Sequence, residues 1–293
     1  MVEVPASLLH LVDSVGEPGA RWLERLPGLV AEAERRFGVR LGPAWPVPIS
    51  FVAPATLADG TAAVLKLTYP EAESAGEAEA LRRWDGDGAV RLLDSAPDLS
   101  ALLLERLEPG TTLWELPEEE ANPLAFAILP RLWKPMPEPH PFPVLRVEAA
   151  RWAEEIPRLW EKRGRPYERS LAEEGAALAA ELAASVDEDV LLHQDFHNGN
   201  VLAAEREPWL AIDPKPIVGD RAFDTASLVR DRRDELAADP HPARRIRRRV
   251  DFVCDELGLD RARVRGWGVV HALFWGSNEL MYACARWIAE VPA

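Results

Sequence analysis

The sequence predicts an α+β fold, in which a small antiparallel sheet with one packed helix precedes a larger, mainly helical region. Three observations lead to this prediction. Short apolar stretches alternate with turn signals over the first third of the 293 residues. Longer stretches with helical spacing dominate after residue 146. Hydrophobic residues make up 47% of the chain, which is enough to bury a sizeable core.

The first third of the chain combines one helix with a sheet. Residues 19–38 have apolar residues at helical spacing. Residues 49–69 contain two strands around an Asp59-Gly60 turn, which is a hairpin signal. A helix is expected over 74–84, and two further strands over 89–107. This order of strands around one helix is typical of a small antiparallel sheet with a helix packed on it.

The pattern changes near residue 108, where a turn and linker begin. Residues 122–143 are rich in proline and are expected to be irregular in part. Within 189–213 two short apolar stretches predict strands, the second folded back on itself as a hairpin. Helices are expected over 146–163, 170–186, 222–238, 244–257 and 264–289.

Charge and cysteine content exclude several classes of protein. The net charge of −15 argues against binding to nucleic acid or to anionic lipid. Such an acidic surface suits solubility and also helps to collect a cationic substrate. Cys254 and Cys284 are too far apart in sequence for a zinc ribbon and too few for a disulfide framework. Because neither a signal peptide nor a membrane-spanning stretch is recognisable, we expect a cytoplasmic protein.

Residues 191–202, "LLHQDFHNGNVL", carry the strongest chemical signal. Asp195 and Asn200 are five residues apart, and Asp213 follows thirteen residues later, at the end of the predicted hairpin. Because the two ends of a hairpin lie side by side, Asn200 and Asp213 are expected to meet. Amide and carboxylate oxygens suit Mg²⁺ that carries phosphates. Asp195 is then placed to orient a hydroxyl group and accept its proton, as in kinases.

A metal-dependent hydrolase is the rival interpretation of the same stretch. His193, Asp195 and His197 alternate, so a strand would present all three on one face. The other histidines are scattered, whereas a hydrolytic metal site keeps three or more side-chain ligands. His193 is better interpreted as a buried histidine that supports the loop.

A kinase must also hold ATP. Lys66 lies in a stretch that otherwise reads as a buried strand, and Glu77 or Glu79 in the next helix is its candidate partner. Glu77 is preferred, because it borders the apolar stripe of that helix. Such a pair holds the α- and β-phosphates in kinases. Backbone groups of Glu105, Arg106 and Leu107 are candidates to hydrogen-bond adenine.

An acidic stretch farther along the chain offers a possible substrate site. Asp224, Asp231 and Asp234 are candidates to attract an ammonium or guanidinium group of the substrate. Acidic residues at helix starts are also favourable on their own, through the helix dipole.

The stretches "HQDFHNGNVL" and "AIDPKPIVGDRAFD" together resemble the aminoglycoside phosphotransferases, in particular the streptomycin 6-kinase and hydroxyurea phosphotransferase branch. The resemblance implies a protein-kinase-like bilobal fold, with an N-lobe over 1–107 and a C-lobe over 108–293. It implies ATP- and Mg²⁺-dependent phosphorylation of a hydroxyl group on a small molecule. By position, it makes Asp195 catalytic, Asn200 and Asp213 the metal ligands, Lys66 and Glu77 the phosphate-holding pair, and Asp220 a structural carboxylate.

One departure from that pattern leaves alternatives open. Related kinases carry a glycine-bearing turn over the phosphates, but this chain has no glycine between Gly42 and Gly60. Either the backbone amides of Ile49–Phe51 replace it, or the nucleotide is held loosely. An aminocyclitol antibiotic such as streptomycin is the preferred acceptor. Hydroxyurea or another small metabolite is the alternative, and a nucleotide-binding pseudokinase is the alternative of another class.

Overall fold

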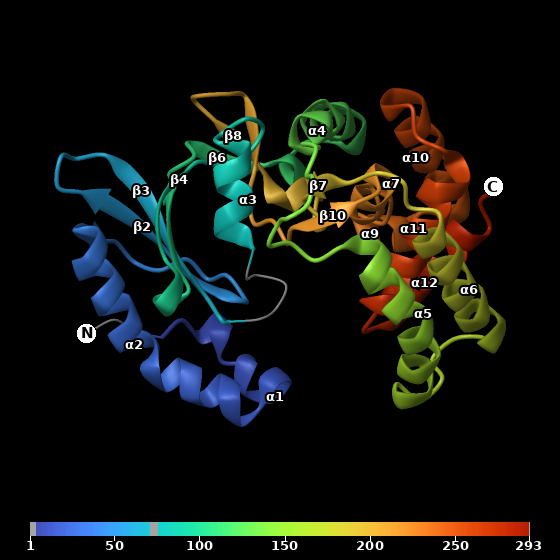
Figure 1. Ribbon diagram of the computed structural model, residues 1–293, viewed down its shortest axis with the longest axis horizontal. Coiled ribbons are helices and arrows are strands. Elements are labelled where there is room, and N and C mark those ends of the chain that lie inside the picture. Colours follow the sequence, from blue (N-terminus) through green and yellow to red (C-terminus); the bar gives the residue numbers. More distant parts are fainter. Residues whose placement is uncertain (1–3, 71–75, 293) are drawn as a thin grey trace. The chain divides into compact units, whose positions relative to one another are not determined.

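The computed structural model describes residues 4–70 and 76–292 (Figure 1). The chain forms two compact units, which are described separately. Unit 1 comprises residues 1–110 and 203–208, and unit 2 comprises 111–202 and 209–293. The division into 1–107 and 108–293 remains a prediction; the observed unit 1 also takes in the segment 203–208.

Unit 1 is built on a five-stranded antiparallel sheet with the order β1-β2-β3-β5-β4. The Asp59-Gly60 turn joins β2 to β3 as expected, and the Asp59 carboxylate accepts a 2.9 Å hydrogen bond from the Thr61 N–H. The predicted small antiparallel sheet is therefore confirmed. Its strands are β1 (Val39–Leu41), β2 (Ser50–Leu57), β3 (Ala62–Thr68), β4 (Leu92–Ala96) and β5 (Ala101–Glu105).

Helices cover the two faces of this sheet. The long helix α2 (Glu17–Phe37), preceded by α1 (Leu11–Val15), packs Trp22 and Leu26 against Leu65 and Leu67 of β3. Alternation along β3 turns Lys66 to the opposite face, where α3 (Glu77–Trp84) lies (Figure 1). Helix α3 was expected over 74–84; residues 74 and 75 lie outside the described part of the chain.

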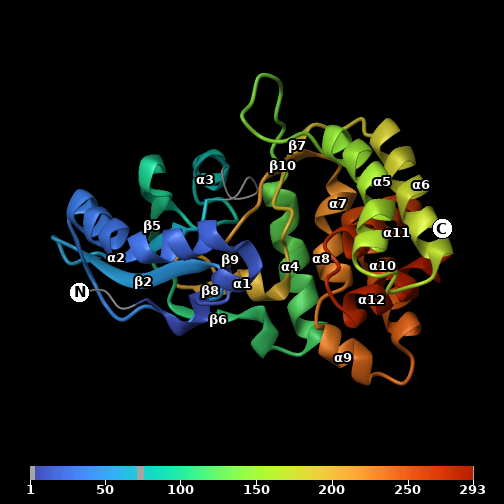
Figure 2. The same ribbon diagram turned by 90° about the horizontal axis from the view of Figure 1, so that it is seen from below.

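Unit 2 is mainly helical, and most of its helices gather in one bundle (Figure 2). Helix α11 (Arg261–Phe274) packs on α5 (Leu145–Lys162), α6 (Arg169–Ala184) and α12 (Glu279–Ala289), and α5 also packs on α6. The helices of unit 2 are α4 (Glu118–Leu132), α5 (Leu145–Lys162), α6 (Arg169–Ala184), α7 (Arg221–Asp224), α8 (Ala226–Val229), α9 (Arg233–Ala238), α10 (Pro242–Leu257), α11 (Arg261–Phe274) and α12 (Glu279–Ala289).

Besides the five-stranded sheet, the described residues form two short sheets. Strands β7 (Val190–Leu192) and β10 (Ile217–Gly219) pair antiparallel. Strands β6 (Pro109–Thr112), β8 (Val201–Ala204) and β9 (Trp209–Ala211) form a sheet with the order β6-β8-β9. The predicted hairpin over 201–213 is therefore confirmed, with β8 and β9 as neighbours.

The expectation that residues 122–143 are irregular in part is confirmed for 133–143, whereas helix α4 occupies the stretch up to Leu132. It continues to Leu132 although Pro123 and Pro130 lie inside it. Ala125, Phe126 and Leu129 are buried at helical spacing, and this burial outweighs the roughly 3 kcal/mol that an internal proline costs. Only the remainder, 133–143, is irregular.

Two of the predicted helices are broken. The stretch 222–238 splits into α7, α8 and α9, and the break between α8 and α9 lies at Arg232, which takes a left-handed conformation with φ +52°. The stretch 264–289 splits into α11 and α12, where the Asn278 side chain accepts a 3.0 Å hydrogen bond from the Met281 N–H and caps α12.

Within residues 4–70 and 76–292, the structure holds no helix whose length and apolar character would let it cross a bilayer.

Candidate functional site

Lys66 and Glu77 form a buried ion pair in unit 1. The Lys66 Nζ lies 2.6 and 2.7 Å from the two carboxylate oxygens of Glu77. Their side chains are 7% and 4% exposed. Glu79, the other candidate, pairs instead with Arg82 and Arg83 on the surface of α3. The structure thus brings Lys66 to Glu77, and the contact of this pair with a nucleotide remains a prediction.

Glu105 is engaged in contacts inside unit 1. Its backbone N–H donates to the Arg91 carbonyl at 3.0 Å. Its carboxylate accepts from the Arg91 N–H at 2.8 Å and from the Arg206 guanidinium at 2.6 and 3.1 Å. The N–H of Glu105 is therefore already paired within unit 1, and a contact of its carbonyl with adenine remains a prediction. Adenine contacts by Arg106 and Leu107 remain predictions.

The backbone of Ile49–Phe51 lies at the start of β2. Ser50 and Phe51 pair with Thr68 and Leu67 of β3, and the Phe51 side chain is 2% exposed. These backbone pairings with β3 fix the start of β2, although this segment contains no glycine. Whether its amides contact phosphates remains a prediction.

A tight turn precedes Asp195 in unit 2. Gln194 has φ +67°, a left-handed conformation that is unfavourable for a residue with a side chain. The two oxygens of Asp224 accept hydrogen bonds from the backbone N–H of Gln194 at 2.6 Å and of His193 at 3.1 Å. This buried carboxylate stabilises the turn that presents Asp195.

The expectation that Asp224 binds substrate is wrong. Asp224 is 0% exposed and also accepts a 3.0 Å hydrogen bond from the Trp133 indole. Burial raises the pKa of Asp224 to about 6, and the N–H donors of His193, Gln194 and Trp133 oppose this rise. The side chain supports the loop from inside the protein and cannot touch a substrate.

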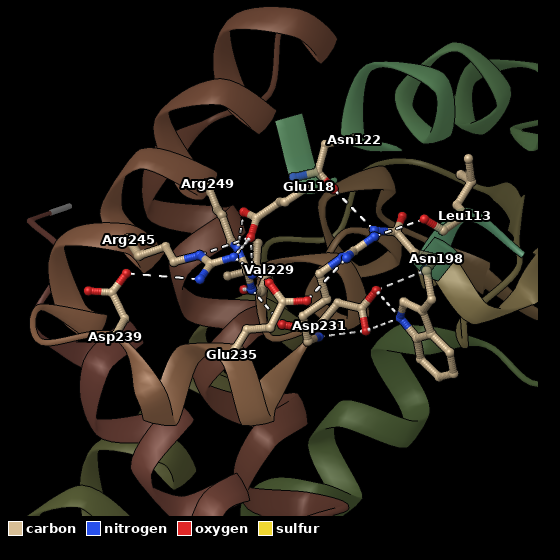
Figure 3. Close-up of polar contacts among 12 residues, drawn as sticks. Leu113, Glu118, Asn122, Asn198, Val229, Asp231, Glu235, Asp239, Arg245 and Arg249 are labelled. Atoms are coloured by element: carbon tan, nitrogen blue, oxygen red, sulfur yellow. Dashed lines mark hydrogen bonds and ion pairs between the residues drawn. The ribbon is translucent and has the colours of Figure 1, made fainter. Parts of the chain in front are cut away.

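Asp231 is likewise held inside unit 2, which corrects its assignment to substrate. It is 8% exposed. Its oxygens accept from the Trp114 indole at 3.0 Å and from the backbone N–H of Asn198 at 2.9 Å and of Arg232 at 2.8 Å (Figure 3). Asp234 is exposed in the first turn of α9, and its contact with a substrate remains a prediction.

A buried charge network supports Asp231. Arg249 donates to the backbone carbonyls of Val229 at 3.0 Å and Asp231 at 2.6 Å. It also donates to both carboxylate oxygens of Glu118 at 2.6 Å, and Arg245 pairs with the same carboxylate (Figure 3). Burial acts to raise the pKa of Glu118, but the two arginines outweigh it and lower the pKa to about 2. The network thus connects α4 and α10 to the segment that holds Asn198.

His193 is a support for the loop, and its placement argues against the metal-cage interpretation. It is 0% exposed, and its Nε2 lies 2.9 Å from the Ile212 carbonyl. Burial lowers the pKa of His193 to about 4, so the ring is neutral and its Nε2–H donates to that carbonyl. Within residues 4–70 and 76–292, no three His, Cys, Asp or Glu side chains are arranged to hold a metal ion.

Asp195 has one cationic and one aromatic neighbour. Its Oδ2 lies 3.2 Å from the Lys215 Nζ, and its Oδ1 lies 3.9 Å from the His197 Nε2. Burial acts to raise the pKa of Asp195, but Lys215 and the nearby histidines together outweigh it and hold the pKa well below its usual range. The His197 Nδ1 accepts from the Gly199 N–H at 3.1 Å, and its ring stacks on Trp114 at 5.1 Å. Asp195 is therefore an ionised carboxylate whose side chain remains 24% exposed.

Asn200 and Asp213 lie at the two ends of the β8–β9 hairpin. The Ile212 N–H donates to the Asn200 carbonyl at 2.9 Å, which brings the residue before Asp213 beside Asn200. The Asn200 Nδ2 donates to the Asp195 carbonyl at 2.9 Å, leaving its amide oxygen as a ligand. The Asp213 side chain is exposed, and its backbone has φ +60°. An amide and a carboxylate oxygen fit Mg²⁺, with phosphates and water as the other ligands.

Asp220 lies in the core of unit 2. It is 4% exposed and accepts from the Trp267 indole at 2.6 Å, from Arg263 at 2.8 Å and from the Ala222 N–H at 2.9 Å. These contacts tie the start of α7 to α11, as a structural carboxylate would. The carboxylate that holds the loop of Asp195 is Asp224.

Comparison with known proteins identifies the family. A sequence profile described as aminoglycoside/hydroxyurea antibiotic resistance kinase matches residues 47–279. The chain belongs to this family. The resemblance seen in the sequence is thereby confirmed, and the protein is a phosphotransferase.

Individual relatives agree with this family. Streptomycin 6-kinase of Streptomyces glaucescens is 40% identical over 269 residues, covering 91% of this chain and 87% of the relative. Hydroxyurea phosphotransferase of Kitasatospora aureofaciens is 42% identical over 272 residues, covering 91% and 77%. A crystal structure of a thermostable aminoglycoside phosphotransferase APH(4)-Ia, in ternary complex with ADP and hygromycin B, matches with a TM-score of 0.60. At 16% identity, over 88% of this chain and 94% of that one, it confirms the protein-kinase-like fold.

Sequence reasoning missed three contributors to the site. Lys215 lies within the stretch "AIDPKPIVGD", but the sequence alone did not indicate a role for it. Trp114 lies in a stretch interpreted only as linker. The support by Asp224 was missed because a buried and an exposed aspartate look alike in sequence. The sequence held a usable signal only for Lys215, a lysine placed between two prolines directly after the candidate metal ligand Asp213.

Proposed function

We propose that the protein is an ATP- and Mg²⁺-dependent O-phosphotransferase whose acceptor is streptomycin or a similar aminocyclitol antibiotic. One observation carries this proposal: the ionised, partly exposed Asp195 is joined through the Asn200 side chain to the hairpin that ends at Asp213. The 40% identity to a streptomycin 6-kinase over 91% of the chain supports the choice of acceptor. We also propose a cytoplasmic location, where ATP is available.

The candidate residues of the two units divide the chemistry among them. Asp195 accepts a hydrogen bond from the acceptor hydroxyl and orients its oxygen for in-line attack. Asn200 and Asp213 would hold Mg²⁺, which neutralises charge on the phosphates when bound. Lys66, fixed by Glu77, contacts the α- and β-phosphates. Positioning and charge neutralisation are the main contributions to catalysis of phosphoryl transfer.

The cationic character of the acceptor matches the acidic chain. Of the three aspartates first considered for this role, Asp234 alone is exposed. It is proposed to attract an ammonium or guanidinium group of the acceptor. An Asp234→Asn variant is expected to raise the KM for streptomycin about two- to fivefold without changing kcat, as for a screened surface charge. An unchanged KM removes Asp234 from the acceptor site.

Hydroxyurea is the second candidate acceptor, favoured by the 42% identity to a hydroxyurea phosphotransferase. A test compares streptomycin, a second aminoglycoside and hydroxyurea with Mg-ATP, measuring ADP release and the phosphorylated product by mass spectrometry. We expect kcat/KM for streptomycin to exceed that for hydroxyurea at least about 100-fold. The reverse order selects hydroxyurea. Binding of Mg-ATP in a thermal-shift assay without any product selects the pseudokinase alternative.

A further inference from the structure

Lys215 is the cation that faces Asp195, and nothing in the proposed function yet uses it. Its Nζ lies 3.2 Å from the Asp195 Oδ2, and its side chain is 31% exposed. We propose that Lys215 is a catalytic residue, whose ammonium group binds the phosphoryl group during its transfer to the acceptor. This inference rests on the proposed function and adds a residue to it.

The backbone fixes Lys215 relative to Asp195. The His193 carbonyl accepts hydrogen bonds from the N–H of both Asp195, at 2.8 Å, and Lys215, at 3.0 Å. Pro214 and Pro216 flank Lys215, and both are buried. Because proline restricts φ, the chain around Lys215 has little freedom while the long side chain keeps its reach. Hydrogen bonds to the same carbonyl therefore hold the backbones of Asp195 and Lys215 close to each other.

The distances suit contact with the transferred group. An acceptor hydroxyl bound to Asp195 has its oxygen about 2.6–3.2 Å from the carboxylate, and the phosphorus lies about 3–3.5 Å farther in an attack geometry. An ammonium group already 3.2 Å from that carboxylate is within reach of the phosphoryl oxygens, given the flexible four-carbon stem of lysine. It also offsets the repulsion between the negative Asp195 and the negative phosphates.

A purely structural role explains the contact poorly. An ion pair whose members are 31% and 24% exposed contributes about 1 kcal/mol or less to stability. In the transition state, by contrast, negative charge spreads over three phosphoryl oxygens. A cation fixed beside them stabilises this charge and so raises the rate of transfer.

Residue usage points the same way. Among 34 basic residues, lysine occurs only at positions 66, 134, 162 and 215. Arginine therefore supplies positive charge almost everywhere else in this chain. Two of the four lysines are the one paired with Glu77 and the one paired with Asp195. A compact ammonium group with rotatable donors, rather than a planar guanidinium, suits both positions.

One variant and one matched control test the inference. Lys215→Met keeps the length of the side chain and removes its charge; Lys162→Met does the same at the exposed end of α5. We expect Lys215→Met to lower kcat about 10²- to 10³-fold with the KM values for ATP and acceptor changed less than about threefold. Lys162→Met is expected to behave as wild type. A kcat within about threefold of wild type in Lys215→Met overturns the inference.

A binding measurement separates contact with phosphate from mere positioning of Asp195. The probe is Mg-ADP with aluminium fluoride, which mimics the transferring phosphoryl group, and Mg-ADP alone is the reference. We expect Lys215→Met to lose at least about tenfold in affinity for the mimic and to keep its affinity for Mg-ADP, whereas Asp195→Asn keeps both. Retained affinity for the mimic in a folded Lys215→Met overturns the direct contact. If wild type phosphorylates none of the acceptors, the proposed function fails instead, which is a different result.

Discussion

The carboxylate of Asp224 accepts a 2.6 Å hydrogen bond from the backbone N–H of Gln194, the residue directly before Asp195. Gln194 is in a left-handed conformation, so the turn needs support from its surroundings. Asp224 provides it from a position 31 residues farther along the chain, through the N–H of His193 as well. The orientation of Asp195 thus depends on a carboxylate that never meets the substrate.

The first prediction concerns this support. In Asp224→Asn, one accepting oxygen becomes an NH₂ group, which cannot accept from a backbone N–H, so the N–H of either Gln194 or His193 loses its buried acceptor. We expect a loss of about 2–4 kcal/mol in the free energy of unfolding, and at least about a tenfold lower kcat with little change in the KM for ATP. Denaturant unfolding and steady-state kinetics measure these effects. The exposed Asp234→Asn serves as the control for stability, and equal unfolding midpoints in the two variants contradict the account.

The second prediction concerns pH and Glu118. Its pKa is about 2 in the folded chain, against an ordinary value of 4.5. A lowered carboxyl pKa stabilises the fold fully above the ordinary value, and this stabilisation is lost as the pH falls toward the folded value. We expect Glu118→Gln to be about 3 kcal/mol less stable than wild type at pH 6, and this gap to narrow by about 2 kcal/mol at pH 3.

Glu119→Gln is the matched control for Glu118, because the neighbouring side chain lies exposed in the same first turn of α4. It should leave the stability unchanged at both pH values. If the difference in the free energy of unfolding between Glu118→Gln and wild type stays constant with pH, the charge of the Glu118 carboxylate does not stabilise the fold.

The third prediction concerns the buried pair of Lys66 and Glu77. Lys66→Met leaves the Glu77 carboxylate buried without its cation, which should destabilise unit 1 by about 3–5 kcal/mol. Lys66→Met combined with Glu77→Leu removes both charges and should recover most of that stability. Both variants should bind Mg-ATP at least about tenfold more weakly than wild type in calorimetry. Normal ATP affinity in the stable double variant would mean that Lys66 does not touch the phosphates.

The fourth prediction concerns Mg²⁺ and Asp213. Replacing its carboxylate in Asp213→Asn removes a negative ligand, so the Mg²⁺ concentration for half-maximal activity should rise at least about tenfold. Chelation of Mg²⁺ should abolish turnover of the wild type. Asp187→Asn, at another exposed aspartate, is the control. An Mg²⁺ dependence that is the same in all three proteins excludes Asp213 as a ligand.

Much of the fold could be predicted because local signals and burial agree. The Asp59-Gly60 turn with alternating apolar flanks predicts the β2–β3 hairpin, and the structure has it. The prolines correctly predict irregular structure over 133–143, but not which part stays helical, because in α4 buried contacts that only the tertiary structure supplies override their local preference. The break at Arg232 has no signal of its own, since a left-handed arginine is fixed by its surroundings.

The site could be predicted where the spacing of residues along one segment determines how their side chains lie relative to one another. Asp195, Asn200 and the hairpin that leads to Asp213 follow from local sequence, and so does the Lys66–Glu77 pair once strand alternation is considered. Asp224 and Asp231 could not be assigned, because their partners, Gln194 and Trp114, are distant in sequence. Acidic residues in that region suggested a surface that attracts cations, whereas tertiary packing makes two of them internal hydrogen-bond acceptors.

The most direct test of the central claim is a single-turnover measurement of phosphoryl transfer to streptomycin by Asp195→Asn, with Mg-ATP binding measured in the same protein. The account predicts that transfer slows at least about 10³-fold while the Kd for Mg-ATP stays within about threefold of wild type. Transfer at the wild-type rate in this variant would contradict the account.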